Sequence, residues 1–455
     1  MRNIAKILCL LFLIVSPTFA AYGLPPADQA LNIEPSIDQP FTFTNLFGFF
    51  DTDQQYLTGN WGGLRDKLSG KGVDINMTYA GDFLNNVTGG KACGFNYNDS
   101  TGLDFNFDME KMKGWQGLQF HVSGLYRQGK NISQRLIGNA FVASSLYGQQ
   151  QLRLYGLYAQ KSLFKDSLNI RLGRISAGDD FASSPLYQVY VNNSIDGNPI
   201  SFPINLTSST YPNAQWGVRA KFRPVNSFMW MGGVYNADGR VGRNEAHGAD
   251  FTIKARRGIL FIQEFSYLSN QKGMPDELPG NYKAGFYYNS GYFKDYYKDD
   301  NGNSYAISGL SQKKHHGNYG MYVHMDQMVY RKPNGKDGQG LTPFVVVTLA
   351  PSDTNQFPFF IDGGLVYKGL IPKRASDVTA IGIAYGQYSR QLSKYQQDSG
   401  IAQQKYEMMV EATYKIMVTK WFYLQPDVQY IMNPNGGNQN NSDALVVGTR
   451  VGLTF

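Results

Sequence analysis

The chain has 455 residues, with 42 Lys and Arg against 35 Asp and Glu, and a formal net charge of +7. Charged residues make up 17% of it, below the roughly 25% of an ordinary soluble domain, while Tyr, Phe and Gly are abundant. Two Cys exclude a disulfide scaffold and a Cys-rich zinc protein. No stretch after residue 20 approaches the ~20 apolar residues of a membrane-spanning helix. The basic residues form no block of like charges, so the positive charge does not indicate a nucleic-acid partner.

The first twenty residues have the pattern of a cleavable export signal. Arg2 and Lys6 form a basic start, and residues 7–15 form an apolar core that is too short to span a membrane. Small residues then predict cleavage after Ala20; the alternative is a buried first strand. Residues 21–56 carry Pro and Asp without a clear period, which predicts an extended N-terminal segment before a main domain at 57–455.

A short amphipathic helix is predicted over residues 60–70. Asn60 can cap its start, Leu64 and Leu68 are spaced i, i+4, and Gly70 can end it. We expect Trp61 to anchor this helix rather than to stack on a ligand.

After this helix the hydrophobic period changes to two. Residues 73–83 carry apolar side chains at positions 73, 75, 77, 79 and 83 and polar ones at 74, 76, 78 and 82. Successive side chains of a strand point to opposite sides, so such a segment predicts a strand with one apolar and one polar face. Sixteen strand-like runs follow one another: 73–86, 102–112, 118–128, 151–163, 168–176, 215–224, 228–237, 258–268, 280–293, 317–330, 340–350, 359–370, 377–389, 404–418, 421–432 and 443–455.

The connections between these runs tend to alternate between short and long. The short ones are 113–117, 164–167, 225–227 and 419–420, and the long ones include 129–150, 177–214 and 390–403. Short turns on one side and long loops on the other are typical of outer-membrane barrels. The rule has exceptions, since 351–358 is a short loop and both 269–279 and 331–339 are long turns.

Strand length, the export signal and the terminal Phe455 together favour a membrane barrel over a secreted β-helix or sandwich. A sheet in lipid must close on itself because lipid offers no hydrogen-bond partners. We therefore predict an all-β fold: a transmembrane antiparallel β-barrel of about 16 strands, with a short N-terminal periplasmic helix. A barrel of ~16 strands encloses a water-filled channel rather than a packed core.

Motifs along residues 57–455 resemble a known family. They are Leu57–Arg65 with Leu68 and Gly72, Gly138–Phe141, Arg153–Tyr155, Arg171–Arg174, Gly178–Pro185, Asn192–Asn193, Tyr211–Gly217, Glu411–Tyr414, Leu424–Ile431 and Asn433–Gly437. As a set they resemble the carbohydrate-selective porins of the OprB family. The resemblance implies an outer-membrane channel that passes monosaccharides such as glucose by diffusion. It implies no cofactor, metal or catalysis, and partners that are small sugars, outer-membrane lipid and lipopolysaccharide. It leaves open the association of copies into a homo-oligomer.

We expect loop 177–214, and with it 129–150, to fold into the lumen and narrow it, because long ordered loops are often functional. Arginine offers a rigid fork of donors to sugar hydroxyls, and carboxylates accept from them. The candidate sugar contacts on the wall are Arg127, Arg153, Arg171 and Arg174, and those on the loop are Asp179, Asp180, Tyr187, Tyr190, Asn192 and Asn193. The loop groups would face Arg127, Arg171 and Arg174. Alternatively, the Arg and Asp side chains only satisfy one another, and the two tyrosines pack the loop against the barrel.

Other functions stay open at this point. The same arginines could serve a general or anion-leaning porin, and the lumen of a structural or adhesive barrel could be closed. A barrel hydrolase would need Ser and His on the outer wall, where Ser266 and His324 are candidates that no motif joins. His315 and His316 are too close in sequence for a usual zinc pair and lack a carboxylate at ligand spacing, which predicts solvated surface. The Asp299–Ser304 stretch lacks the closing Glu of a calcium loop and predicts an exposed turn.

Overall fold

The computed structural model describes residues 53–455 except 149, 207–208, 271–277, 334, 336–337 and 438–440. The predicted signal peptide and most of the predicted N-terminal segment lie outside the described residues. The strands are β1 (Val73–Gly90), β2 (Gly94–Asp108), β3 (Leu118–Gly129), β4 (Leu152–Leu163), β5 (Leu168–Ile175), β6 (Gln215–Val225), β7 (Phe228–Asn236), β8 (Ile259–Ser269), β9 (Gly280–Asp299), β10 (Gln312–Gln327), β11 (Tyr330–Arg331), β12 (Gly340–Leu349), β13 (Phe359–Lys368), β14 (Val378–Gln387), β15 (Tyr406–Met417), β16 (Phe422–Met432) and β17 (Ser442–Thr454). The helical segments are η1 (Trp61–Gly63), α2 (Leu64–Gly70), α3 (Met109–Lys113), η2 (Ser133–Ile137), α4 (Ala177–Asp180), η3 (Tyr187–Val189), α5 (Ser201–Leu206), η4 (Gly239–Gly242), η5 (Asn244–Ala246), η6 (Ala255–Arg257), α6 (Tyr305–Ser308), α7 (Arg390–Asp398) and η7 (Pro434–Gly437).

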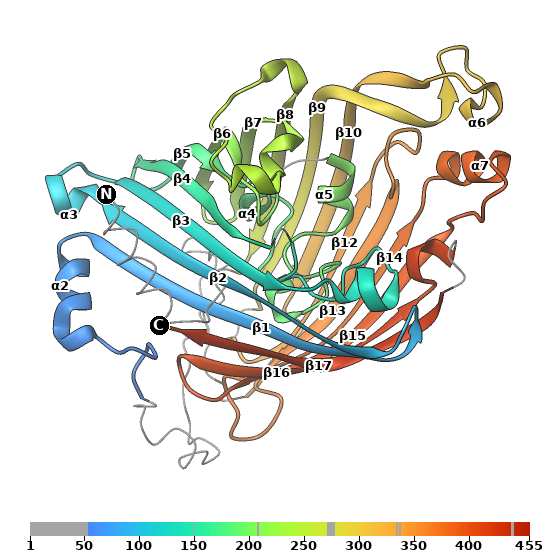
Figure 1. Ribbon diagram of the computed structural model, residues 1–455. Helices are drawn as coiled ribbons and strands as arrows, with labels where there is room; N and C mark the ends of the chain where they lie inside the picture. The colour runs from blue at the N-terminus through green and yellow to red at the C-terminus, as the bar shows by residue number, and fades with distance from the viewer. Residues whose placement is uncertain are drawn as a thin grey trace, which may run out of the picture.

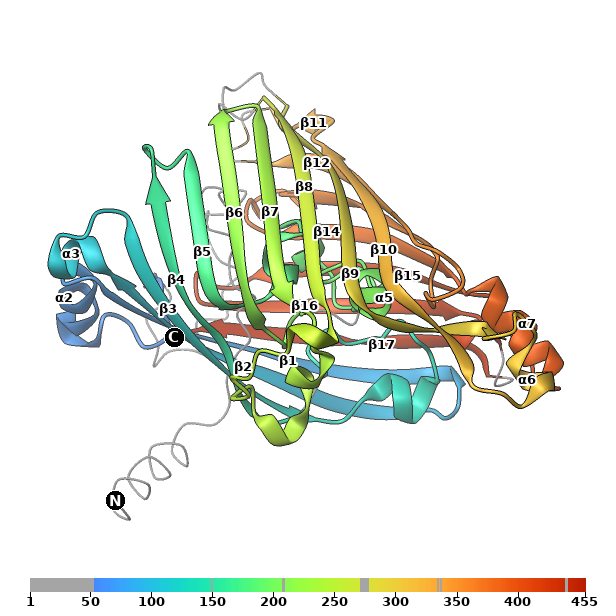
Figure 2. The ribbon, with the colours of Figure 1, turned by 90° about the horizontal axis from the view of Figure 1, so that it is seen from above.

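Sixteen long strands form one closed antiparallel barrel (Figures 1 and 2). Each long strand pairs with the next one along the chain, and the two-residue β11 adds a short pairing beside β12. The barrel closes where β1 pairs with β17, from Thr78 opposite Thr454 to Gly90 opposite Ser442. Closure satisfies the edge hydrogen bonds that an open sheet would leave free. The predicted fold class is confirmed.

The predicted boundaries differ most from the observed ones at three strands, β2, β9 and β10. β2 begins at Gly94, eight residues before the predicted start, and residues 109–113 form the helix α3 instead of its end. Asp108 causes this helix to begin, because its carboxylate accepts the backbone N–H groups of Glu110 and Lys111. β9 runs on to Asp299 and β10 begins at Gln312, so this hairpin is longer than its apolar period indicated.

The two ends of the barrel differ, as Figures 1 and 2 show. α2 and α3 lie at one end, with the short connections; we call it the turn end. α6 and α7 lie at the other, which we call the loop end. The predicted helix is observed as α2, and Asn60 Oδ1 accepts the Asp66 backbone N–H at 3.1 Å. Trp61 donates to Thr58 Oγ1 at 2.9 Å, and the Arg65 guanidinium lies over its ring at 4.2 Å.

The outer wall is apolar, as the period of two predicts for a barrel in lipid. Large exposed hydrophobic side chains on the strands include Phe265, Phe286, Met321, Val323, Leu365, Ile381, Ile383 and Val428. No helix in the described part of the chain is long and apolar enough to cross a membrane.

Candidate functional site

Two long connections at the loop end turn back into the barrel: residues 130–151, between β3 and β4, and residues 176–214, between β5 and β6. In Figures 1 and 2 the segment that carries α5 lies inside the ring of strands. Phe141 of the 130–151 loop packs against the wall residue Phe360, and Tyr187 of the 176–214 loop packs against Phe344, with ring centroids 5.6 and 5.5 Å apart. These residues belong to one buried cluster, so both loops pack against the inside of the barrel wall instead of extending into solvent.

Wall carboxylates hold the backbones of both loops. Glu407 of β15 accepts the N–H groups of Ala140 and Phe141 at 2.8 and 2.6 Å. Glu411 of the same strand accepts those of Val191 and Asn192 at 2.6 and 3.0 Å. Two carboxyl side chains on one strand, β15, therefore hold the backbones of both loops.

The 176–214 loop is also fastened through four of the predicted sugar contacts. Tyr187 Oη lies 2.6 Å from His324 Nδ1, and Tyr190 Oη donates to the Ile381 carbonyl at 3.1 Å. Asn192 Nδ2 donates to Gln429 Oε1 at 2.8 Å, and the Asn193 backbone donates to Val142 O at 2.9 Å.

These contacts correct the expectation that this part of the loop faces the arginines. Tyr187 and Tyr190 are at most 1% exposed and pack the loop against the opposite wall, the alternative reading of these two tyrosines. His324 is 1% exposed and Ser266 is equally buried, so neither lies on the outer wall that a barrel hydrolase would need.

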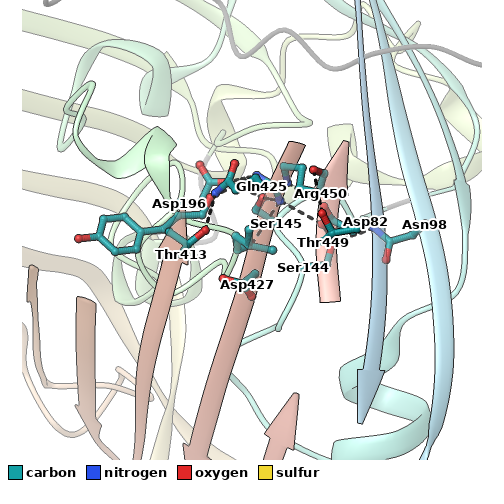
Figure 3. A network of polar contacts seen from close by, with 12 residues as sticks. Asp82, Asn98, Ser144, Ser145, Asp196, Thr413, Gln425, Asp427, Thr449 and Arg450 are labelled. Carbon is teal, nitrogen blue, oxygen red and sulfur yellow. Dashed lines mark hydrogen bonds and ion pairs between the residues drawn. The ribbon is translucent and has the colours of Figure 1, made fainter. Parts of the chain in front are cut away.

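One arginine joins the two loops to the closing strands (Figure 3). Arg450 of β17 contacts Asp82 of β1 through Nε and Nη2, at 2.7 and 3.0 Å. Its Nη1 contacts Asp196 of the 176–214 loop at 2.8 Å, and its Nη2 donates to Ser145 of the 130–151 loop at 2.9 Å. Two backbone carbonyls, of Tyr190 and Val191, accept from the same guanidinium.

The loops leave a cavity of about 550 Å³ beside β1–β5 and β15–β17. Groups on its wall are Asn76, Thr78, Asp104, Asn106, His121, Tyr155, Tyr158, Gln160, Arg171, Arg174, Lys415, Tyr423 and Arg450, and loop groups are Leu146, Asp179, Asp180, Gln188 and Asp196. The volume falls within the ~300–1,000 Å³ usual for small-molecule sites. Most of the lining residues are polar or charged, and tyrosine rings lie among them.

Four of the predicted residues meet at this cavity. Asp180 forms ion pairs with Arg171 at 3.2 Å and with Arg219 at 3.1 Å. The Arg171 guanidinium also lies over the Tyr158 ring, 4.7 Å from its centroid. Asp179 accepts from Tyr155, and Arg174 also lines the cavity. The predicted opposition of Asp180 and Arg171 is therefore present.

The two neighbouring carboxyls differ in acidity because their surroundings differ. Burial raises the pKa of Asp179 to about 7, although Tyr155 donates to it. Burial also disfavours the charged form of Asp180, but the guanidiniums of Arg171 and Arg219 outweigh it and hold the pKa of Asp180 below its ordinary value. The cavity thus has one permanent carboxylate and one that ionises near neutral pH.

Three of the predicted arginines, Arg127, Arg153 and Arg174, hold loops in place. Arg127 donates to Gly148 O at 2.9 Å and lies over the Tyr211 ring at 4.3 Å. Arg153 donates to Asn213 and to two carbonyls of the loop between β7 and β8. Arg174 reaches the Asp250 carbonyl of that same loop at 3.0 Å.

Sequence reasoning missed the residues that hold the loops. Glu407, Glu411 and Arg450 lie at polar positions of alternating strands, which assigns them to the lumen. Nothing in that alternation says which loop each one holds. An acidic side chain on the lumen face of a strand was the available signal, because a buried carboxylate needs donors.

Comparisons with known proteins agree with this geometry. The profile of the family described as "Carbohydrate-selective porin, OprB family" matches residues 93–455. Porin B of Pseudomonas aeruginosa is 28% identical over 428 residues, which cover 89% of this chain and 92% of that protein. The putative porin QuiX of Acinetobacter baylyi is 24% identical over 452 residues, covering 90% and 94%. The high-pH structure of Pseudomonas putida OprB superposes with a TM-score of 0.83 at 26% identity, over 89% of this chain and 100% of that one.

The family match spans most of the chain, and the closed barrel with its polar, loop-lined cavity is the structure such a channel requires. The chain belongs to the OprB family of carbohydrate-selective porins and forms a sugar channel in the bacterial outer membrane.

Proposed function

We propose that neutral sugars of monosaccharide size pass through the cavity beside β1–β5 and touch Arg171, Asp179 and Asp180 on the way. The support is the position of these side chains on a cavity of about 550 Å³, between the loops and the polar part of the wall. Short turns of such barrels face the periplasm, so sugar would enter at the loop end and leave at the turn end.

The charge of the lining favours a neutral solute over an anion. Four basic side chains, Arg171, Arg174, Lys415 and Arg450, line the cavity together with four acidic ones, Asp104, Asp179, Asp180 and Asp196. Several of these charges already neutralise each other, as in the pairs of Asp180 with Arg171 and of Asp196 with Arg450. Such a lining offers donors and acceptors to hydroxyls without a strong field of one sign.

Aromatic faces beside cations occur at two places on the cavity wall. Arg171 lies over Tyr158 on β5 and β4, and Lys415 Nζ lies 4.2 Å from the centroid of Tyr423 on β15 and β16. The apolar face of a sugar ring packs on a tyrosine while its hydroxyls meet the neighbouring cation. Because the cations are already partnered, a sugar only competes with existing contacts, and binding stays weak enough for release.

Sugar block of ion current in planar bilayers tests this proposal. Replacing Arg171 and Arg174 with Ala should weaken the block by glucose. The exposed Arg390 at the start of α7 supplies a control for the loss of arginine charge, because Arg390→Ala removes one positive charge at the loop end, outside the cavity lining. An unchanged glucose block in the double variant would remove both arginines from the sugar path. A reversal potential strongly selective for anions would instead favour an anion-leaning porin.

A further inference from the structure

Three side chains of the kinds that bind metal ions converge at the loop end. None of them lines the sugar cavity. They are Asp295 near the end of β9, His315 near the start of β10, and Asp353 in the loop between β12 and β13. One ligand atom of each lies within 4.8 Å of the other two. His315 Nε2 is 2.8 Å from Asp295 Oδ2 and 3.9 Å from Asp353 Oδ2.

This cluster corrects the expectation that His315 lacks a carboxylate partner. Asp295 and Asp353 lie 20 and 38 positions away from it in the chain, outside any local ligand spacing. In the long β9–β10 hairpin His315 lies opposite Phe293, two residues before Asp295, and the backbone N–H of Tyr296 donates to the Asp353 carbonyl at 2.8 Å. The tertiary structure thus brings together three residues that are distant from one another in the sequence.

The two carboxylates of the cluster have no Lys or Arg partner among the described residues. The Asp295 side chain is only 1% exposed, and its Oδ1 already accepts the backbone N–H groups of Tyr297 and Lys298 at 2.8 Å. Its Oδ2 points at His315. Two carboxylates and an imidazole offer oxygen and nitrogen donors whose negative charge a divalent cation balances.

We propose that Asp295, His315 and Asp353 bind a divalent transition-metal ion of the zinc type. Imidazole nitrogen and carboxylate oxygen bind Zn²⁺ at about 2.0–2.2 Å, which places ligand atoms roughly 3 Å apart. Asp295 and His315 already have that separation, and Asp353, whose side chain is 38% exposed, has room to move the remaining distance. Water would complete the coordination. Mg²⁺ and Ca²⁺ prefer oxygen ligands only, so the imidazole selects against them.

A metal here would connect the β9–β10 hairpin to the loop between β12 and β13. That loop also carries Phe357, whose backbone exchanges hydrogen bonds with the Asn205 side chain of the 176–214 loop, at 2.8 and 3.2 Å. The loop between β12 and β13 therefore connects the proposed metal site, at Asp353, to the 176–214 loop that borders the cavity, at Phe357.

Zinc titration of the full-length, chelator-treated protein in detergent tests the proposal, with isothermal calorimetry as the readout. The wild type should bind one equivalent of Zn²⁺ that His315→Gln and Asp353→Asn each weaken by at least about tenfold. His316 supplies the matched control, because it is the next residue, its side chain points to the other face of the strand and its ring packs on Tyr292. His316→Gln should keep the equivalent, and neither MgCl₂ nor CaCl₂ should displace it.

Cobalt substitution gives a second readout that does not depend on stoichiometry. Co²⁺ bound by one imidazole and two carboxylates should show visible absorption that disappears in His315→Gln and persists in His316→Gln. If wild type and His315→Gln bind zinc equally, or if wild type binds none, the site is refuted and the cluster is a hydrogen-bonded His–Asp pair. Wild-type single-channel conductance in both variants would establish that they are folded.

Discussion

Replacing Arg450 with Met removes the guanidinium that joins the barrel seam to both inserted loops, while keeping a side chain of similar length. The change deletes two contacts to Asp82, one to Asp196, one to Ser145 and two to loop carbonyls. The Asp82 and Asp196 side chains are 0% and 1% exposed, so both carboxylates would be left buried without their cation.

The magnitude follows from this burial. Removing one partner of a buried ion pair costs about 3–5 kcal/mol. Arg450 borders the cavity, so water can reach the abandoned carboxylates, and the lower end, ~3 kcal/mol, is the appropriate figure. The loss weakens the docking of the loops. The backbone hydrogen bonds between the strands are unchanged. The ratio of docked to released loops should therefore fall by roughly two orders of magnitude.

Single-channel recording is the suitable assay. Released loops should give Arg450→Met a larger mean conductance, more current noise and a weaker sugar block, with the barrel still folded. The control is Arg243→Met, since Arg243 is 54% exposed and lies 3.8 Å from Asp250, a surface pair worth at most ~1 kcal/mol. Adding Asp82→Asn and Asp196→Asn to Arg450→Met should restore part of the loop docking. Conductance, noise and sugar block that match the wild type in Arg450→Met would refute the reasoning.

Three further changes test other parts of the structure. Glu407→Gln removes one of the two carboxylate oxygens that accept loop N–H groups and should lower the free energy of unfolding by about 1–3 kcal/mol in a denaturant titration, whereas the exposed Glu245→Gln should not. Gly89→Ala places a Cβ against the Asp443 carbonyl at a φ of 74° and should lower the heat-unfolding midpoint, more than Gly302→Ala, which has a similar φ and open space. Asp179 should make cation selectivity rise between about pH 6 and about pH 8, because its pKa of about 7 means that the carboxyl gains its charge in that interval.

Each of these predictions has an opposite outcome that counts against its premise. Equal unfolding curves for Glu407→Gln and the wild type would mean that the loop amides find other acceptors. If Gly89→Ala costs no more than Gly302→Ala, the close approach of β1 to β17 at Gly89 is not real. The raised pKa of Asp179 means that the folded state binds this proton more tightly than the unfolded state does. The contribution of Asp179 to the free energy of unfolding is therefore lost as pH rises through about 7. A pH step in selectivity that survives Asp179→Asn would assign it to another group.

The inner face of the barrel has two parts, and the difference explains why the cavity is off-centre. Where the wall borders the cavity, its inward residues are polar, as with Asn76 and Thr78 of β1. Where the loops pack, inward residues are apolar, as with Val346 of β12, Phe360 of β13 and Ala380 of β14. A loop packed on apolar wall excludes water, so the aqueous path runs along the polar part.

The period of two in residues 73–86 and 404–455 was sufficient to predict a barrel, because alternation decides which side chains face lipid and which face the lumen. It was also sufficient to place Arg171 and Glu411 inside. Runs such as 340–350 alternate poorly because both of their faces are apolar: the outward face belongs to the apolar outer wall, and the inward residues Phe344 and Val346 pack in the buried cluster with the loops. That signal of a covered inner wall is present in the sequence. The covering loop, however, cannot be identified from a single strand.

Partner choice was decided by tertiary structure alone. Glu411 accepts from residues 191 and 192, more than 200 positions away, and Asp295 meets His315 only because a hairpin and a distant loop converge. Alternation is a local property, since each residue's side follows from its neighbours along one strand. Contacts between a loop and the wall depend instead on how the closed barrel brings all sixteen strands around the same interior, and no local pattern records that.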